Sequence, residues 1–89
     1  MSMIISMEEI KEFEKLKILS HITIVKEKIK LFENKYKCKF ENFENKVKKE
    51  KEEFEKWDDY IEWKAYVDTL RYLERKLRDV DNAKDIRIA

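Results

Sequence analysis

Residues 63–80 read WKAYVDTLRYLERKLRDV, and their large apolar side chains recur at alternating spacings of three and four residues. The members of this repeat are Trp63, Tyr66, Leu70, Leu73, Leu77 and Val80. This spacing places all six along one side of an α-helix, as is typical of a helix packed lengthwise against another helix. The stretch therefore predicts a long helix with an apolar seam that needs a partner helix.

A second stretch with the same spacing lies upstream and is a suitable partner. Its six apolar members are Ile18, Ile22, Val25, Ile29, Phe32 and Tyr36. Two seams of equal length can pack antiparallel, and the register pairs residues whose numbers sum to 98 or 99, from Ile18 with Val80 to Tyr36 with Trp63. We therefore predict an all-α fold, an antiparallel helical hairpin with a short connecting helix.

The composition favours helix throughout this 89-residue chain. There is no Gly and no Pro, so the best residues for tight turns and phosphate-binding loops are missing. The 21 basic and 20 acidic residues nearly cancel, and 43% of the chain is apolar, which argues against disorder. Lys and Glu dominate the charges, as they do in proteins of thermophiles. A single small helical domain covering residues 1–89 is the expectation.

The first two helices have recognisable boundaries. Ser6 and Glu9 form a capping-box pattern, so helix 1 is predicted over about residues 6–36. Within it, residues 18–25 are rich in β-branched side chains, but strict alternation is absent and both flanks are helical, so we expect helix here, with a bend possible near Ser20. After a turn at residues 37–39, helix 2 is predicted over about residues 40–52, with Phe40, Phe43 and Val47 on one face.

The third helix is predicted over about residues 59–80. Asp58 or Asp59 can cap its start, and Glu62, three residues after Asp59, imitates a capping box. Asp81 and Asn82 suit a helix exit. The tail, residues 81–89, is predicted to be a frayed end or a short extended segment.

The residues that carry chemistry are too few for a catalytic or metal site. His21 is the only histidine and Cys38 the only cysteine, so neither a metal cage nor a nucleophile with its base can be assembled. The six acids of residues 52–62 lack the turn glycine of a calcium-binding loop. We predict no enzyme activity, no cofactor and no bound metal.

The sequence also predicts where the protein is located in the cell. A lone cysteine fits a reducing cytoplasm. The N-terminal MSMIIS lacks the basic segment of a signal peptide, and no apolar run approaches the roughly 20 residues needed to cross a bilayer. The expectation is a cytoplasmic protein without a membrane segment.

Charge is segregated along the chain. Residues 26–51 hold ten Lys against five Glu, whereas residues 52–62 hold six acids against Lys56. A solvated helix surface explains both runs most simply. The Lys-rich region 26–51 leaves nucleic-acid binding open as an alternative function, although a nearly neutral domain is unlike the basic domains that bind nucleic acid.

Two further groups of side chains are candidate interfaces. Trp57, Tyr60 and Tyr72 lie off the seam of the third helix, where Trp and Tyr can anchor a partner protein. At the start of helix 1, the apolar residues Ile10, Phe13 and Leu16 precede the seam, and nothing helical in one hairpin is left to cover them. This uncovered stripe predicts a homodimer.

Three segments also resemble a known group of proteins. Residues 32–43 read FENKYKCKFENF, residues 57–66 read WDDYIEWKAY and residues 70–74 read LRYLE. They are similar to the pattern E-x-K-Y-G-M-S-F-E-E-F, D-D-Y-x-E-W-x-A and L-x-x-L-E of small archaeal and thermophilic-bacterial helical proteins. The resemblance covers residues 32–77. Lys37 departs from it where the pattern has Gly, and Lys39 where it has a Ser or Thr cap.

Members of this group are often encoded as the smaller half of toxin–antitoxin pairs. The resemblance therefore implies a non-catalytic protein-binding module that neutralises a partner toxin by stoichiometric binding. The positions that match the pattern are the implied contact residues: Trp57, Asp58, Asp59, Tyr60, Glu62 and Trp63. With Tyr72 from the off-seam aromatics, they make up the predicted partner-binding surface.

Overall fold

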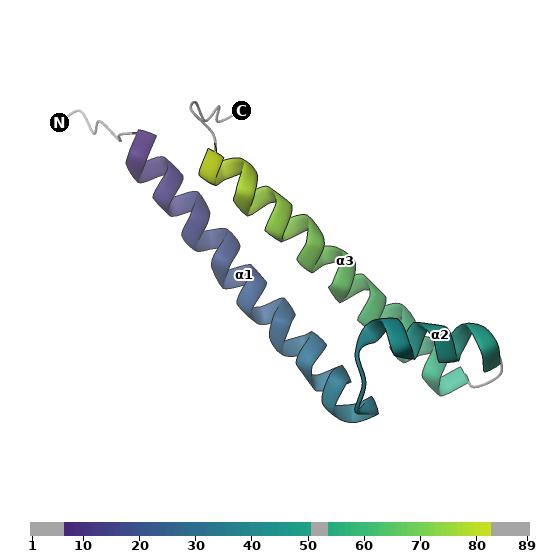
Figure 1. Ribbon diagram of the computed structural model, residues 1–89. Helices are drawn as coiled ribbons and strands as arrows, with labels where there is room; N and C mark the ends of the chain where they lie inside the picture. The colour runs from purple at the N-terminus through teal and green to yellow at the C-terminus, as the bar shows by residue number, and fades with distance from the viewer. Residues whose placement is uncertain (1–6, 51–53, 83–89) are drawn as a thin grey trace.

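The computed structural model describes residues 7–50 and 54–82. Three helices make up this part of the chain: α1 (Met7–Tyr36), α2 (Phe40–Glu50) and α3 (Phe54–Asn82). The long helices α1 and α3 lie side by side and antiparallel, and α2 folds across the end where α1 finishes and α3 begins (Figure 1). The molecule is a rod of 62 × 19 × 19 Å. The predicted all-α hairpin with a short connecting helix is confirmed.

The seam between α1 and α3 is built from the two predicted apolar repeats. Ile18, Ile22 and Val25 of α1 are buried together with Leu73 of α3. Around them pack the half-buried residues Ile29, Tyr66, Leu70, Leu77 and Val80. Burial of such side chains contributes about 1.5–3 kcal/mol each, so this seam is a main source of stability.

The predicted register is observed at the end of the seam near α2. The rings of Phe32 and Tyr66 lie 6.2 Å apart, and those of Tyr36 and Trp63 lie 6.1 Å apart, as the paired sequence numbers require. At the other end, Lys15 of α1 forms an ion pair of 2.9 Å with Asp81 of α3. Both ends therefore agree with the predicted pairing to within one helical turn.

The β-branched stretch at residues 18–25 is helical, and α1 runs through Ser20 without interruption. The Thr23 hydroxyl donates a hydrogen bond of 3.0 Å to the carbonyl oxygen of Leu19, four residues earlier. This bond satisfies the hydroxyl inside the helix, while Ile18, Ile22 and Val25 gain burial there. Tertiary packing thus outweighs the weak strand preference of these residues.

The turn between α1 and α2 depends on one left-handed residue. Lys37 has φ of 55°, a conformation that Gly adopts at lower cost, at the position directly after the last residue of α1. Three residues later α2 begins at Phe40, and the amide of Phe43 donates to the carbonyl oxygen of Lys39 at 3.2 Å. The chain thus makes a helix exit without glycine.

The predicted start of α3 is wrong. The helix begins at Phe54, so Asp59 is its sixth residue and does not cap it. No Gly or Pro precedes Asp59 to stop the helix, and the Asp59 carboxylate is already occupied by side chains of α1. The predicted end at Val80 is close to the observed Asn82, and α2 ends at Glu50. Ser6, residues 51–53 and residues 83–89 lie outside the described part.

Candidate functional site

The seven predicted partner-binding residues do not form one surface, because the fold divides them. Trp63 and Tyr60 are buried in the hydrophobic core, with Trp63 0% exposed. Asp59 is turned toward α1, where two side chains hold it. The remaining four lie at exposed positions of α3: Trp57, Asp58, Glu62 and Tyr72.

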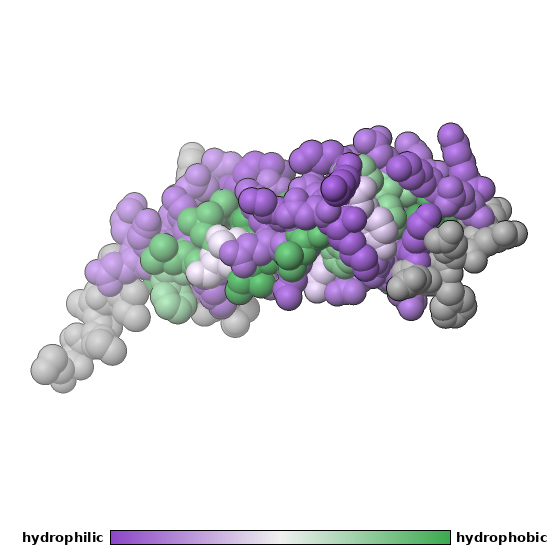
Figure 2. Space-filling view, turned by 90° about the horizontal axis from the view of Figure 1, so that it is seen from below, coloured by the Kyte–Doolittle hydropathy of each residue, from purple (hydrophilic) through white to green (hydrophobic). Residues whose placement is uncertain are grey.

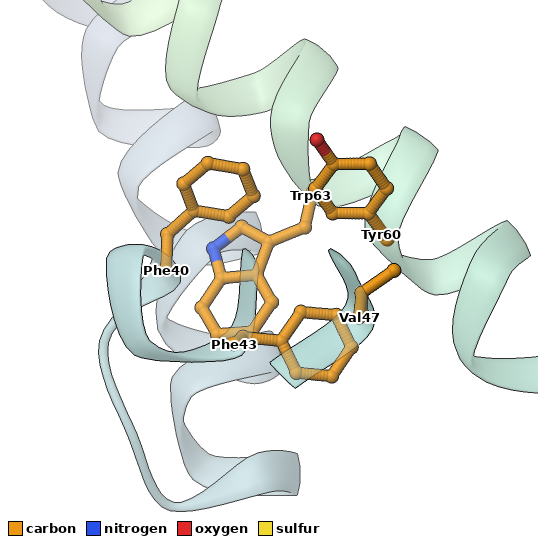
Figure 3. Packing of buried hydrophobic residues seen from close by; sticks show 5 residues of the cluster. All are labelled: Phe40, Phe43, Val47, Tyr60 and Trp63. Carbon is orange, nitrogen blue, oxygen red and sulfur yellow. The ribbon is translucent and has the colours of Figure 1, made fainter. Parts of the chain in front are cut away.

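Trp63 is the centre of an aromatic cluster that joins all three helices. Its ring lies 5.5 Å from Phe32 of α1, and 5.5 Å and 5.0 Å from Phe40 and Phe43 of α2, between ring centroids. Figure 3 shows the indole between these two α2 side chains, with its nitrogen on the side facing Phe40. The N–H has no hydrogen-bonding partner, and the edge-to-face packing on Phe40 explains how it is accommodated. The residue is structural.

Tyr60 belongs to the same cluster and not to an exposed surface, which corrects the prediction. Its ring stacks on Phe40 at 5.9 Å, and its hydroxyl donates a hydrogen bond of 2.7 Å to Glu44 of α2. This bond raises the pKa of Tyr60, since it stabilises the neutral phenol beside a carboxylate. In a bare two-helix hairpin this position would be open. Here α2 covers it.

Asp59 fastens α3 to the last turn of α1. Its Oδ2 accepts a hydrogen bond from Lys35 Nζ at 2.7 Å and a second, short one from the Tyr36 hydroxyl. The Lys35 ammonium, and then the Tyr36 hydroxyl, lower the pKa of Asp59. Burial, together with the Asp59 carboxylate, raises the pKa of Tyr36 to about 12. This arrangement is an interhelical clamp, because every group in it is satisfied within the chain.

Three of the four exposed residues of the predicted partner-binding set lie in one row of exposed residues along α3, and Glu62 lies outside it. We name this row the α3 outer face: Trp57, Asp58, Ile61, Ala65, Asp68 and Tyr72. Trp57, Ile61 and Tyr72 are 49%, 52% and 55% exposed. Their spacing of four and eleven residues keeps them on one side of the helix, opposite the seam. Sequence reasoning missed Ile61, although its spacing of four residues from Trp57 was the available signal.

The predicted homodimer residues lie on α1 away from α3. Phe13 and Leu16 are 66% and 62% exposed, while Ile10 is half-buried. Phe13 and Leu16 are exposed because they lie on a side of α1 that faces away from α3. The same side of α1 also carries the exposed Ile24 and Leu31. Seen from below in Figure 2, apolar patches interrupt the charged surface along the length of the molecule.

His21 and Cys38 lie outside the α3 outer face. His21 is exposed, and Cys38 is half-buried in the turn before α2, where it packs against the aromatic cluster. In residues 7–50 and 54–82, no group of three or more His, Cys, Asp or Glu side chains is placed to hold a metal ion. The described helices also include none that is long and apolar enough to span a membrane.

Three lysines of the Lys-rich region are paired with acids of the same chain. Lys35, Lys39 and Lys48 each make an ion pair with an acid of the chain, at 2.7, 3.2 and 3.8 Å. These contacts offset part of the positive charge that a phosphate backbone would need.

Comparison with known proteins identifies the family of this chain. No curated protein and no solved structure matches it. The sequence profile of the family described as "Uncharacterized protein MJ0235 family" matches residues 1–85, nearly the whole chain. The protein therefore belongs to the uncharacterized protein MJ0235 family.

Proposed function

We propose that this protein is a non-catalytic protein-binding domain whose docking surface is the α3 outer face. The observation that carries the proposal is the row of Trp57, Ile61 and Tyr72, each about half exposed on one side of one helix. Single exposed apolar residues are common, but Trp and Tyr are the residues that most often anchor protein interfaces. A row of three exposed apolar side chains, two of them Trp and Tyr, fits insertion of a helix face into an apolar groove.

The geometry of the row supports this mode of binding. Trp57 and Tyr72 are 15 residues apart, so the anchors span about 22 Å of helix. Trp57 also rests on Tyr60, with ring centroids 5.4 Å apart, and Tyr60 is fixed by its contacts with α2. A side chain that is already held in place loses less conformational entropy on binding. The N-terminal half of the α3 outer face is thus preorganised.

The charge around the row indicates the kind of partner. Residues 54–68 hold five acids against Lys56 and Lys64, a balance of −3. Asp58 and Asp68 of this set lie on the α3 outer face itself. Acids beside apolar anchors fit a partner whose groove has a basic rim, since complementary charge speeds association and rejects other partners.

Neutralisation of a toxin is the form of this function that the sequence resemblance implies. A ribonuclease toxin needs a basic surface to hold RNA, and an acidic helix face could cover that surface by stoichiometric binding. Such binding would use Trp57, Asp58 and Tyr72 among the residues first singled out. We place it in the cytoplasm, which suits the single free thiol of Cys38.

A matched pair of variants tests the proposal. Immobilised wild-type chain is incubated with a lysate of the source organism, in parallel with Ile61→Asp on α3 and Leu19→Asp on α1. Ile61 and Leu19 are both exposed aliphatic residues, at 52% and 42% exposure, on different helices. We expect a protein that wild type and Leu19→Asp retain and Ile61→Asp loses. Circular dichroism should show equal helicity for all three chains.

The retained protein is then purified and titrated at low and high salt. Association should slow with added salt, because the acids of the α3 outer face contribute to the encounter. Retention by Ile61→Asp equal to that of wild type would show that this face is not the docking surface. Tight binding of random-sequence RNA or duplex DNA, with no protein retained, would favour the Lys-rich region 26–51 as the functional surface.

A further inference from the structure

A second repeat runs along α1 on the side opposite the seam, and four of its eight positions are apolar. Its positions again alternate in spacing between three and four residues, and we name them the α1 outer stripe: Ile10, Phe13, Lys17, Ser20, Ile24, Glu27, Leu31 and Asn34. Phe13, Ile24 and Leu31 are 66%, 56% and 63% exposed. A repeat of this period matches the contact line of a coiled coil, and no other described helix covers it.

We propose that the α1 outer stripe binds a second copy of this chain, with the two α1 helices antiparallel about a twofold axis near residue 22. In this register, each residue faces the one in the other copy whose number completes a sum of 44. Phe13 then meets Leu31, Ser20 meets Ile24, and Ile10 meets Asn34, each twice by symmetry. Since α1 spans Met7–Tyr36, the register also overlaps residues 8–36 of both helices, nearly their full length.

The surface of α1 already contains a hole for one of these side chains. A shallow depression of about 280 Å³ is lined by Glu27, Lys30, Leu31 and Asn34. Four residues with this spacing form the diamond into which a coiled-coil partner inserts one side chain. In the proposed register the side chain opposite Leu31 is Phe13 of the second copy. Phe13, the most exposed of the large apolar side chains in the described residues, thus faces a hole made by its own chain.

Charge complementarity favours a second copy of the chain as the partner and an antiparallel orientation of the two α1 helices. The sum of 44 places Lys17 opposite Glu27 of the second copy, and the flanking Glu14 comes beside Lys28. Residues 8–14 hold four Glu against Lys11, whereas residues 26–36 hold four Lys against two Glu. Antiparallel packing brings these halves together twice, while parallel packing would set like charge on like. A second copy therefore sets Phe13 against Leu31 and places opposite charges at Lys17 and Glu27.

The size of the contact sets the expected affinity. An overlap of 29 residues is about 43 Å long, and a strip about 10 Å wide covers about 430 Å² on each copy. That is about 860 Å² in total, below the roughly 1,000 Å² that specific interfaces usually exceed, so we expect a weak dimer that dissociates on dilution. The α3 outer face lies on the opposite side of each hairpin. The dimer would leave it open on both copies.

Sedimentation equilibrium of the full chain, from low micromolar to millimolar concentration, tests the proposal. The mass should rise with concentration from 11.1 kDa toward twice that value. Leu31→Asp should remain monomeric, because it places a charge in an apolar layer twice per dimer. Leu19→Asp, on an exposed position of α1 outside the stripe, is the matched control and should dimerise like wild type. Far-ultraviolet circular dichroism checks that each variant is folded.

A charge exchange tests the register itself. Lys17→Glu and Glu27→Lys should each weaken the dimer by about tenfold, because each creates two pairs of like charges across the interface. The double variant should restore wild-type affinity, since opposite charges again face each other. Both residues are exposed on the outer side of α1, so the seam of the hairpin stays unchanged.

Three results would overturn the proposal. A wild-type chain that stays monomeric throughout the concentration range excludes the second copy as occupant. Loss of the dimer in Leu19→Asp to the same extent as in Leu31→Asp places the interface elsewhere. Failure of the double charge exchange to recover what the single variants lose excludes the antiparallel register.

Discussion

Lys35 Nζ donates a hydrogen bond of 2.7 Å to Asp59 Oδ2, which joins the last turn of α1 to the second turn of α3. The Tyr36 hydroxyl donates to the same oxygen atom. This clamp lies beside the Trp63 cluster, where all three helices meet. Because Lys35 and Tyr36 both bind the Asp59 carboxylate, this group joins α1 to α3 and does not cap either helix.

Asp59→Asn should reduce stability by about 1 kcal/mol at neutral pH, a modest value because Lys35 is half exposed. The folded state lowers the pKa of Asp59 below its ordinary value of 3.8. The stabilisation is therefore complete above pH 4 and is lost as the pH falls through the folded-state pKa. Urea unfolding of both chains between pH 7 and pH 2 should show curves that converge in acid. A constant difference would contradict the ionic clamp.

Tyr36→Phe should change how the stability of the protein depends on pH in the alkaline range. The pKa of Tyr36 is raised from 10.0 to about 12 in the folded protein, so folding favours the neutral phenol. The stabilisation is complete below pH 10 and is lost as the pH rises toward 12. Thermal unfolding at pH 8 to 12 should therefore show wild type losing stability faster than Tyr36→Phe. Parallel curves would mean that the phenol titrates equally in both states.

Lys37→Gly should stabilise the protein by about 1 kcal/mol. Lys37 has φ of 55°, where a side chain is unfavourable and Gly is not. Glycine also stands at this position in the sequence pattern that the chain resembles. Lys46→Gly, inside α2, is the matched control and should destabilise by about 1 kcal/mol. A Lys37→Gly chain less stable than wild type would show that the lysine side chain has a role in the turn.

Trp63→Phe should cost about 2 kcal/mol and Trp63→Ala about 3–5 kcal/mol, since the indole is fully buried among four aromatic rings. Tyr72→Ala, at an exposed position of the same helix, should change stability by less than about 0.5 kcal/mol. Chemical denaturation measures all three. Equal effects at both positions would contradict the assignment of Trp63 to the core and Tyr72 to the surface.

The seam was predictable because a repeat of three and four residues has one structural meaning in a chain without Gly or Pro. Ile18 to Val80 and Tyr36 to Trp63 could be paired by counting alone. The candidate functional site was harder to predict from the sequence, because the exposure of a residue depends on which helix covers which face. Tyr60 lies off the seam, and only the packing of α2 makes it a core residue. Asp59 has the spacing of a helix cap, but Lys35 and Tyr36 lie 24 and 23 residues away in sequence.

Fluorine NMR of the chain labelled with 5-fluorotryptophan tests the central claim, docking through the α3 outer face, most directly. The two tryptophans are Trp57, which is exposed, and Trp63, which is buried, so each gives one resonance with a distinct environment. Trp57→Phe assigns them. When the protein retained from the lysate is added, the Trp57 resonance should shift or broaden while that of Trp63 keeps its position. A Trp57 resonance that stays unchanged in the saturated complex would contradict docking through this face.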